Sequence, residues 1–532
     1  MMHPLRPYPV PRVRLRVLSA LLSVAGFTSA SAQATPDTLD VLLVGGRVID
    51  GTGTVARVVD LGIRGDRIVF VGKAASASMP ARRRIDVSGL LVAPGFIDPH
   101  AHVLLELGDK NQSGLPGYLV QGVTTVITGN DGGGPERVAE ALDRWTRSGL
   151  GPNAAVLVGH GTVRQRVMGM RDEPADARAV DSMRVLVRGA MREGALGLSS
   201  GLYYAPGSFA TTEEVIALAR EVAPFGGVYD THMRDESSYT VGLLGSVREA
   251  MRVGREGGVP LHIAHIKALG VDVWGRSDSV IAIVDAARAE GLVISADQYP
   301  YLASGTGLGA ALLPRWAEGG GRDSLVRRLN DPALAERLRG EMKENLRRRG
   351  GAASLLLTSA RDTSLVGRTL EQIATRENAD AVTVAIRILL GESPSVASFN
   401  MNQADLDAFA VQPWVVTGSD GSGGHPRKFG AFPKAMRDFA LDRSLMSIEA
   451  FVARSSANTA RIFGLADRGT IAPGAFADII VFDPTGVRDR STYADPTLAA
   501  EGMRWVLVNG VVVIDGGVPT DARPGRTLRP SR

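Results

Sequence analysis

Short apolar runs alternate with amphipathic stretches of helical length through the middle of the chain. Helical patterns such as residues 135–148, 212–223 and 280–290 each come between two strand-like runs. This alternation is typical of a parallel sheet whose strands are connected by helices. The strand candidates are residues 95–102, 123–129, 154–160, 196–201, 227–233, 260–267, 292–299 and 414–420. Eight such units predict an α/β fold, a (β/α)8 barrel of the TIM type.

One connection is much longer than the others. Residues from about 310 to 410 separate the seventh strand candidate from the eighth, which is too long for a single crossover helix. Residues 336–349 within this stretch have the charged pattern of a surface helix. We therefore expect a helical insertion between strands 7 and 8.

Both ends of the chain contain short β-branched runs. Residues 67–71 follow a Gly65-Asp66 turn, and Asn509-Gly510 separates residues 505–508 from 511–514. Neither end has enough strands to bury a sheet face alone, so a small β-sandwich built from both ends is expected. The expected boundaries are 37–93 and 466–520 for the sandwich, 94–465 for the barrel and 521–532 for a tail.

The first 32 residues have the pattern of a cleaved secretory signal. Four arginines and no acidic residue precede an apolar run over 17–27, and small residues follow over 29–34. Cleavage after Ala32 and after Ala34 fits equally well. An uncleaved anchor is the alternative, but the apolar run is shorter than the roughly 20 residues that span a bilayer. The pattern predicts a periplasmic or secreted protein.

The amino-acid composition excludes several kinds of functional site and partner. Cysteine is absent from all 532 residues, which excludes disulfides, thiolate-bound zinc, iron–sulfur clusters and a thiol nucleophile, as well as a lipid-modified cysteine. The formal net charge is +4, and removal of the four signal arginines brings it to zero. No dense basic block with interleaved aromatic residues is present. We expect neither a nucleic-acid partner nor a membrane partner after signal cleavage.

Histidines gather at the ends of the strand candidates, where (β/α)8 enzymes place their chemistry. His100 and His102 end the first strand, and alternation along a strand puts both side chains on one face. His232, His265 and Asp420 end three other strands. Imidazole and carboxylate ligands without thiolate suit Zn²⁺, and Mn²⁺ or Co²⁺ less well.

Asp420 is also placed to accept a proton from a water molecule at such a site. Its alternative role is to cap the next helix. His160 is expected to line the mouth of the barrel without binding metal. His262 is expected on the opposite face of its strand from His265.

Several sequence blocks, in this order, resemble the amidohydrolase superfamily and, within it, the N-acyl-D-amino-acid deacylases (D-aminoacylases). The resemblance extends from about residue 40 to residue 516. The blocks are GFIDPHAH at 95–102, GVTTVITGN at 122–130, GLSSGLYYAPG at 197–207, THMRDE at 231–236, YPY at 299–301, GSDG at 418–421, HPR at 425–427 and GAFP at 430–433.

The resemblance implies two metal positions, filled by one or two zinc ions or another divalent metal. His100, His102 and Asp420 would form one site, and His232 and His265 the other. The family completes the second site with a cysteine after a Gly-Asn pair, and this chain has Asp131 there. A carboxylate can bind zinc and can bridge two ions, so Asp131 is the candidate replacement. The alternative is a solvated loop aspartate.

The resemblance also implies the substrate and the reaction. Family members hold the free α-carboxylate of a small N-acyl amino acid, and the matching positions are Lys267, Tyr299, Ser304 and Arg427. The implied activity is metal-dependent hydrolysis of the amide bond of N-acyl-D-amino acids, with Asp420 as the catalytic residue. The products are a carboxylate and a free D-amino acid. No oligomeric state follows from the sequence.

Two alternatives remain. A cyclic-amide hydrolase of the dihydropyrimidinase or dihydroorotase type shares the fold, but usually relies on a carbamylated lysine ending the fourth strand. Here that strand has Ser199 and Ser200. A non-catalytic secreted binding protein is the other alternative, and it predicts loss of the ligands that this chain retains or replaces.

Overall fold

The computed structural model describes residues 38–73 and 79–530. The predicted signal peptide, residues 1–32, lies outside these residues. Among the residues described, no helix combines the length and apolar character needed to cross a membrane. Residues from Leu39 onward form one compact unit.

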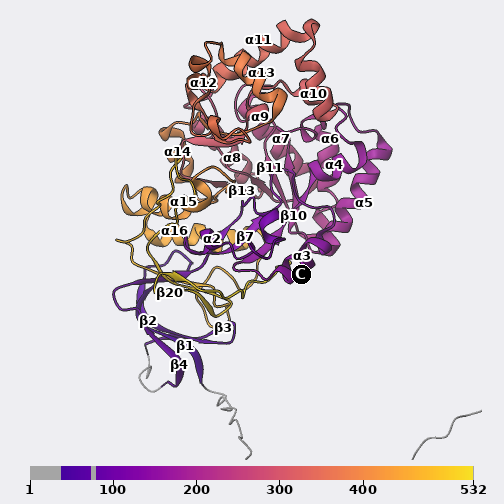
Figure 1. Cartoon of the computed structure of the whole chain (residues 1–532). Coiled ribbons are helices and arrows are strands. Elements are labelled where there is room, and N and C mark those ends of the chain that lie inside the picture. Colours follow the sequence, from indigo (N-terminus) through magenta and orange to yellow (C-terminus); the bar gives the residue numbers. More distant parts are fainter. Residues whose placement is uncertain (1–37, 74–78, 531–532) are drawn as a thin grey trace, which may run out of the picture. The chain divides into compact units, whose positions relative to one another are not determined.

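Parallel strands follow one another in chain order through the middle of the chain (Figure 1). β6, β7 and β8 form one parallel sheet, and β9 to β13 continue in a second sheet that ends with β17. A parallel bridge between Ala101 and Gly421 joins the segments that follow β6 and β17. The strands are β6 (Phe96–Asp98), β7 (Val123–Thr128), β8 (Asn153–Val156), β9 (Val158–Gly159), β10 (Gly197–Gly201), β11 (Val228–His232), β12 (Leu261–Ile263), β13 (Ile294–Gln298) and β17 (Val415–Thr417).

The eight strand candidates are confirmed in position. β8 and β9 are two parts of the third candidate, interrupted at Leu157. Every residue of these strands is buried, which explains why the sequence shows continuous apolar runs. The chain thus has the α/β fold that its sequence predicts.

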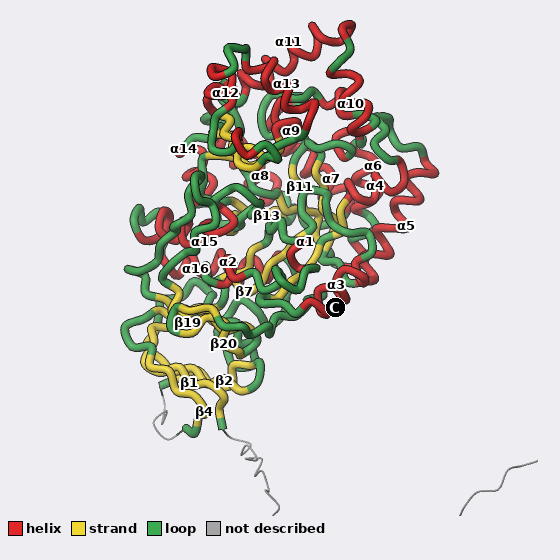
Figure 2. The backbone as a smooth tube through the Cα atoms, in the orientation of Figure 1, coloured by secondary structure: helices red, strands yellow, loops and turns green. Residues whose placement is uncertain are grey.

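Helices cover the parallel strands with their apolar faces (Figure 2). α3 buries Val138, Leu142 and Trp145, and α7 buries Val247 and Val253 at helical spacing. These helices are α1 (Leu104–Leu107), α2 (Pro116–Leu119), α3 (Val138–Ser148), α4 (His160–Met168), α5 (Ala177–Glu193), α6 (Thr212–Ala219), α7 (Gly242–Gly257), α8 (Ser277–Ala289), α15 (Arg427–Ala435), α16 (Ile448–Ser455) and α17 (Ala457–Ile462).

The segment between β13 and β17 has its own apolar core, formed by residues such as Leu312, Leu338 and Leu389. It contains helices, as predicted, but also an antiparallel sheet in the order β14-β16-β15. The prediction of a helical insertion is therefore incomplete, because β14 and β16 pair across a long sequence separation and their small or hydroxylated residues give little apolar alternation. The elements are β14 (Ala303–Gly307), α9 (Leu308–Leu312), α10 (Gly321–Leu329), α11 (Pro332–Arg348), β15 (Leu355–Ser359), α12 (Leu370–Arg376), α13 (Ala381–Gly391), β16 (Ser395–Phe399) and α14 (Gln403–Ala410).

The two ends of the chain meet in one nine-stranded sheet. β5 and β18 pair antiparallel, with Ala93 opposite Ile480, and this pairing joins the two ends. Leu43 and Ile63 from one end share a core with Ile479 and Leu507 from the other. The strands are β1 (Leu39–Val48), β2 (Arg57–Arg64), β3 (Arg67–Gly72), β4 (Ala81–Asp86), β5 (Leu91–Pro94), β18 (Ile479–Phe482), β19 (Met503–Val508), β20 (Val511–Asp515) and β21 (Val518–Pro519).

The described part of the predicted tail, residues 521–530, is not free of the fold. The Ala154 amide donates to the Arg526 carbonyl at 2.9 Å, and the Leu528 amide donates to the Ala154 carbonyl at 2.8 Å. The segment therefore runs along β8. Its binding uses backbone groups, which the arginine- and proline-rich sequence does not reveal.

Candidate metal centre

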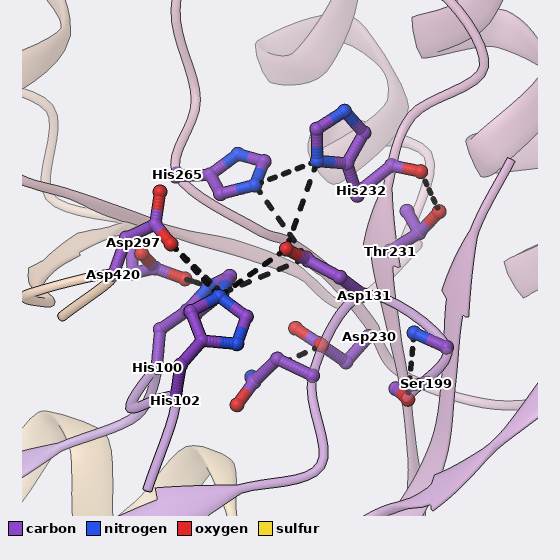
Figure 3. A network of polar contacts seen from close by, with 12 residues as sticks. His100, His102, Asp131, Ser199, Asp230, Thr231, His232, His265, Asp297 and Asp420 are labelled. Carbon is purple, nitrogen blue, oxygen red and sulfur yellow. Dashed lines mark hydrogen bonds and ion pairs between the residues drawn. The ribbon is translucent and has the colours of Figure 1, made fainter. Parts of the chain in front are cut away.

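Six side chains converge where the parallel strands end (Figure 3). The carboxyl ends of parallel strands meet at one face, so residues distant in sequence come together there. The sequence predicted all six as ligands. His100 and His102 follow β6, Asp131 follows β7, His232 ends β11, His265 follows β12 and Asp420 follows β17.

The first group contains His100, His102, Asp131 and Asp420. Nε2 of His100 lies 3.5 Å from Oδ1 of Asp131 and 3.5 Å from Oδ1 of Asp420. Nε2 of His102 lies 3.0 Å from the same Asp420 oxygen and 3.5 Å from Oδ2 of Asp131. Ligand atoms about 2 Å from a tetrahedral ion are roughly 3.3 Å apart, so these separations suit one cation.

Asp131 also belongs to a second group, with His232 and His265. Its Oδ1 lies 3.5 Å from Nε2 of His265, and its Oδ2 lies 3.9 Å from Nδ1 of His232. The two imidazole nitrogens are 2.8 Å apart. The structure thus places Asp131 between both groups, in the position of a bridging carboxylate.

Three of the six residues have backbones in the left-handed region. φ is 55° at Asp131, 35° at His265 and 47° at Asp420. Residues with a Cβ seldom adopt this conformation, which costs on the order of 1–3 kcal/mol and clusters at functional sites. Each is the point where the chain leaves its strand and turns a ligand toward the common centre.

The donor set fits a divalent cation. Both ring nitrogens of His100 and Oδ1 of Asp131 are buried without a hydrogen-bond partner. A buried polar group without a partner lowers the stability of the fold by about 1–3 kcal/mol. Burial lowers the pKa of His100, but the Asp131 and Asp420 carboxylates raise it well above its usual value. Burial raises the pKa of Asp131, yet His100 and His265 hold it well below its usual range. The carboxylates of Asp131 and Asp420 therefore favour a positive charge at the point where the six side chains converge.

A carboxylate lies behind the converging residues, next to His100. Oδ2 of Asp297 lies 3.6 Å from Nδ1 of His100 and 3.0 Å from Nε2 of His262 (Figure 3 draws the first contact). A Cβ on Gly418 would lie 2.6 Å from Oδ1 of Asp297, so glycine makes room for this carboxylate. With Nδ1 facing Asp297, Nε2 of His100 faces Asp131 and Asp420.

Glu236 supports the other imidazole pair. Its Oε1 lies 3.1 Å from Nδ1 of His265 and accepts a hydrogen bond from Nζ of Lys267 at 2.6 Å. Glu236 and Asp297 were not predicted as site residues. The sequence offers only a weak signal for them: Glu236 lies four residues after His232, and Asp297 lies within an otherwise uncharged strand.

Two further histidines lie near the centre. His160 is buried, with Nε2 2.8 Å from Oε1 of Glu214, and belongs to neither ligand group. Nδ1 of His262 lies 2.8 Å from Oγ of Ser295 and its Nε2 lies 3.0 Å from Oδ2 of Asp297. His262 therefore belongs with Asp230 and Asp297 to a group separate from that of His265.

A cavity of about 320 Å³ opens onto the centre and is lined by all four predicted substrate-binding residues. Tyr299 lies beneath the Arg427 guanidinium, 4.8 Å from ring centroid to Cζ. Ser304 donates to Oδ1 of Asn400 at 3.2 Å. Lys267 is engaged by Glu236, as described above.

Arg427 contacts the ligand set directly. Its Nη1 lies 2.7 Å from Oδ2 of Asp420, and its Nη2 donates to Oγ of Ser422 at 3.2 Å. Burial raises the pKa of Asp420, but Arg427 and the neighbouring histidines hold it well below its usual range. A Cβ at Gly305 would lie 2.9 Å from Nη2, so glycine leaves space for this guanidinium.

The sequence profile of the amidohydrolase family matches residues 83–296 and 400–514, which include all six converging residues. The chain belongs to the amidohydrolase family. The matched segments leave out most of the insertion between β13 and β17, so the six converging residues of this amidohydrolase lie within the segments shared with the family and most of the insertion lies outside them.

Similarity to characterised amidohydrolases extends along nearly the whole chain. A D-aminoacylase of Alcaligenes xylosoxydans xylosoxydans is 35% identical over 528 residues, covering 93% of this chain and 99% of the relative. An N-acyl-D-glutamate deacylase of the same organism is also 35% identical, over 92% of this chain and 96% of the relative. The predicted resemblance to the D-aminoacylase branch is confirmed.

A solved structure supports the same grouping. The N-acyl-D-glutamate deacylase of Bordetella bronchiseptica, complexed with zinc and a phosphonate mimic of the tetrahedral intermediate, superposes with a TM-score of 0.79. It is 32% identical, and the match covers 92% of this chain and 100% of the other. That enzyme therefore offers a zinc-bound counterpart for the centre of this amidohydrolase.

Proposed function

We propose that this amidohydrolase hydrolyses the amide bond of N-acyl-D-amino acids and releases a carboxylate and a free D-amino acid. The observation that carries the proposal is the convergence of four histidines and two aspartates on one cavity that also presents Lys267 and Arg427. Similarity to a D-aminoacylase over 93% of this chain supports the substrate class and its stereochemistry.

The metal is proposed to be zinc, as one or two ions, with manganese or cobalt as other divalent choices. His100, His102 and Asp420 would hold one ion, His232 and His265 the other, and Asp131 would contact both. A divalent ion held there would polarise the scissile carbonyl and acidify a water molecule. The 3.0–3.5 Å separations in the first group support this assignment.

Asp420 is the proposed catalytic residue. Its carboxylate would accept the proton of the attacking water and deliver it to the leaving amine nitrogen. Its contact with Arg427 and His102 holds the carboxylate ionised and aimed at the ligand set. Arg427 and Lys267 would attract the substrate α-carboxylate, with Tyr299 and Ser304 beside them.

The proposal includes the arrangement of the chain. The eight parallel strands would close as a (β/α)8 barrel over 94–465, with a β-sandwich from 37–93 and 466–520; the Ala101–Gly421 bridge supports closure. The arginine-led apolar pattern of residues 1–32 supports export to the periplasm or beyond.

The cyclic-amide alternative is disfavoured by β10. Ser199 and Ser200 stand where that group of enzymes carries its lysine, and the Ser199 hydroxyl donates a hydrogen bond to the Gly129 carbonyl. A non-catalytic binding protein is disfavoured because the converging set keeps the histidines and Asp420 and has the carboxylate of Asp131 in place of the family cysteine.

Replacement of Asp420 tests the catalytic assignment. For Asp420→Asn we expect loss of at least about 100-fold in kcat, in line with the value of a positioned acid–base group. Release of amino acid from N-acetyl-D-amino acids measures turnover, and elemental analysis checks metal content. Asp442→Asn, an exposed partner of Arg437, is the control. Undiminished turnover in Asp420→Asn would refute the role.

A further inference from the structure

Three cationic side chains line the cavity: Lys267, Arg349 and Arg427. Two of them have an acidic partner, since Lys267 contacts Glu236 and Arg427 contacts Asp420. Arg349 differs. Within residues 38–73 and 79–530, no carboxylate oxygen lies within 4.0 Å of its guanidinium.

Neutral groups alone surround Arg349, which follows the last residue of α11. The side chain is buried, with 2% of the residue exposed. Nε donates to the Ala311 carbonyl at 3.2 Å, and Nη2 donates to the Tyr203 hydroxyl at 3.1 Å. Nη1 lies 3.2 Å from the Asn400 side-chain oxygen in the amide orientation that satisfies its neighbours.

A buried charge with only neutral partners is costly, and pairing with an anion offsets that cost. The acids of the cavity are already engaged: Asp131 and Asp420 with imidazoles, and Glu236 with Lys267. An anion that pairs with Arg349 would therefore come from outside the described residues. Because Arg349 lines the cavity, a bound substrate can supply it.

Arg349 lies beyond the metal centre rather than in it. The Tyr203 ring separates the two, because its hydroxyl accepts from Arg349 while its centroid lies 5.6 Å from that of His232. Arg427, by contrast, touches the ligand Asp420. The cavity therefore offers two cationic positions, one at the reacting end and one behind Tyr203.

We propose that Arg349 binds a second carboxylate, on the side chain of the substrate, so that N-acyl derivatives of D-dicarboxylic amino acids are preferred. This inference rests on the proposed function and specifies its substrate class. The planar guanidinium fork matches a carboxylate, and its burial makes the charge hard to satisfy with a neutral side chain. Arg349 belongs to the insertion, which the family profile largely omits.

Matched substrates test the proposal with the intact enzyme. N-acetyl-D-glutamate and N-acetyl-D-glutamine differ in one charged group, as do N-acetyl-D-aspartate and N-acetyl-D-asparagine. We expect kcat/KM for at least one acid to exceed that for its amide by about 10-fold or more. The reason is that the neutral amide leaves the buried Arg349 charge without an anionic partner, which disfavours its binding. Acid preference in either pair supports the proposal, and equal values in both pairs overturn it.

Variants assign the preference to Arg349. Arg349→Met should lower the ratio of kcat/KM for the preferred acid to kcat/KM for its amide by about 10-fold or more, and Arg349→Lys should restore part of the preference. Arg339→Met, an exposed change on α11, is the control. Unchanged acid preference in folded Arg349→Met, checked by thermal melting, would overturn the proposal.

The substrate comparison separates this inference from the proposed function. Hydrolysis of the neutral amides without acid preference overturns the role of Arg349 and leaves amide hydrolysis intact. Failure to hydrolyse every N-acyl-D-amino acid contradicts both. The wild-type comparison decides the proposal even where Arg349→Met does not fold.

Discussion

Asp131 is the residue that most distinguishes this centre. Its two carboxylate oxygens face four histidines, with His100 and His265 nearest to Oδ1 and His102 and His232 nearest to Oδ2. A thiolate at the same place could use only one atom to contact both groups. The carboxylate thus suits a bridge between hard or borderline cations.

Loss of the Asp131 carboxylate should therefore weaken metal binding. Changes to groups that only support ligands cost about 10–100-fold in metal affinity, so Asp131→Ala should cost at least that much. Asp131→Cys should retain most of the affinity, because a thiolate also binds zinc. Calorimetric titration of the chelator-treated protein with zinc measures the effect.

Asp143→Ala, an exposed change on α3, controls for general effects of removing an aspartate. Zinc affinity that is the same in Asp131→Ala and in the wild-type protein would remove Asp131 from the ligand set.

The sequence predicted the six converging residues but not the groups behind them. Histidines at strand ends are conspicuous because the chain has eight in all. Asp297 and Glu236 are two of many acids, and their importance follows from contacts with His100 and His265 that only the folded chain creates. Likewise, Arg349 reaches the cavity from a distant insertion.

Strands that are buried on both faces were predictable at the scale of elements, because they give continuous apolar runs. The sheet of the insertion was not, since β14 pairs with β16 across about ninety residues and has little apolar alternation. The pairing of residues 521–530 with β8 escaped prediction for a similar reason, because backbone groups make its hydrogen bonds.

A buried polar cluster connects the nine-stranded sheet with the parallel strands. Asp478, which precedes β18, accepts from the Asn509 amide at 2.8 Å and from Nδ2 of Asn153 in β8 at 3.2 Å. Arg468 also donates to this carboxylate. The cluster therefore connects the turn between β19 and β20 and the start of β18 to the parallel strand β8.

Asp478→Ala should destabilise the protein by about 3–5 kcal/mol, because it leaves the Arg468 charge buried without its partner. The expected readout is a fall of several degrees in the melting temperature. Glu501→Ala removes an exposed partner of Arg490 and should cost less than about 1 kcal/mol. Equal melting temperatures for the two variants would show that the cluster does not stabilise the connection.

At the scale of the whole molecule, the net charge is small, and the charges that matter for binding are those of individual side chains in the cavity. The formal charge without the first 32 residues is zero, so anion binding depends on Lys267, Arg349 and Arg427 inside the cavity. Any ions held by the six ligands would add further positive charge. Attraction of an anionic substrate would therefore depend on individual cationic side chains in the cavity rather than on the net charge of the protein.

The most direct test of the account measures amino-acid release by the purified enzyme from paired N-acetyl-D- and N-acetyl-L-amino acids, before and after metal removal. We expect hydrolysis of the D-substrates, loss of activity after treatment with a chelator, and recovery on addition of zinc. Full activity in protein shown to be metal-free, or hydrolysis confined to the L-substrates, would contradict the account.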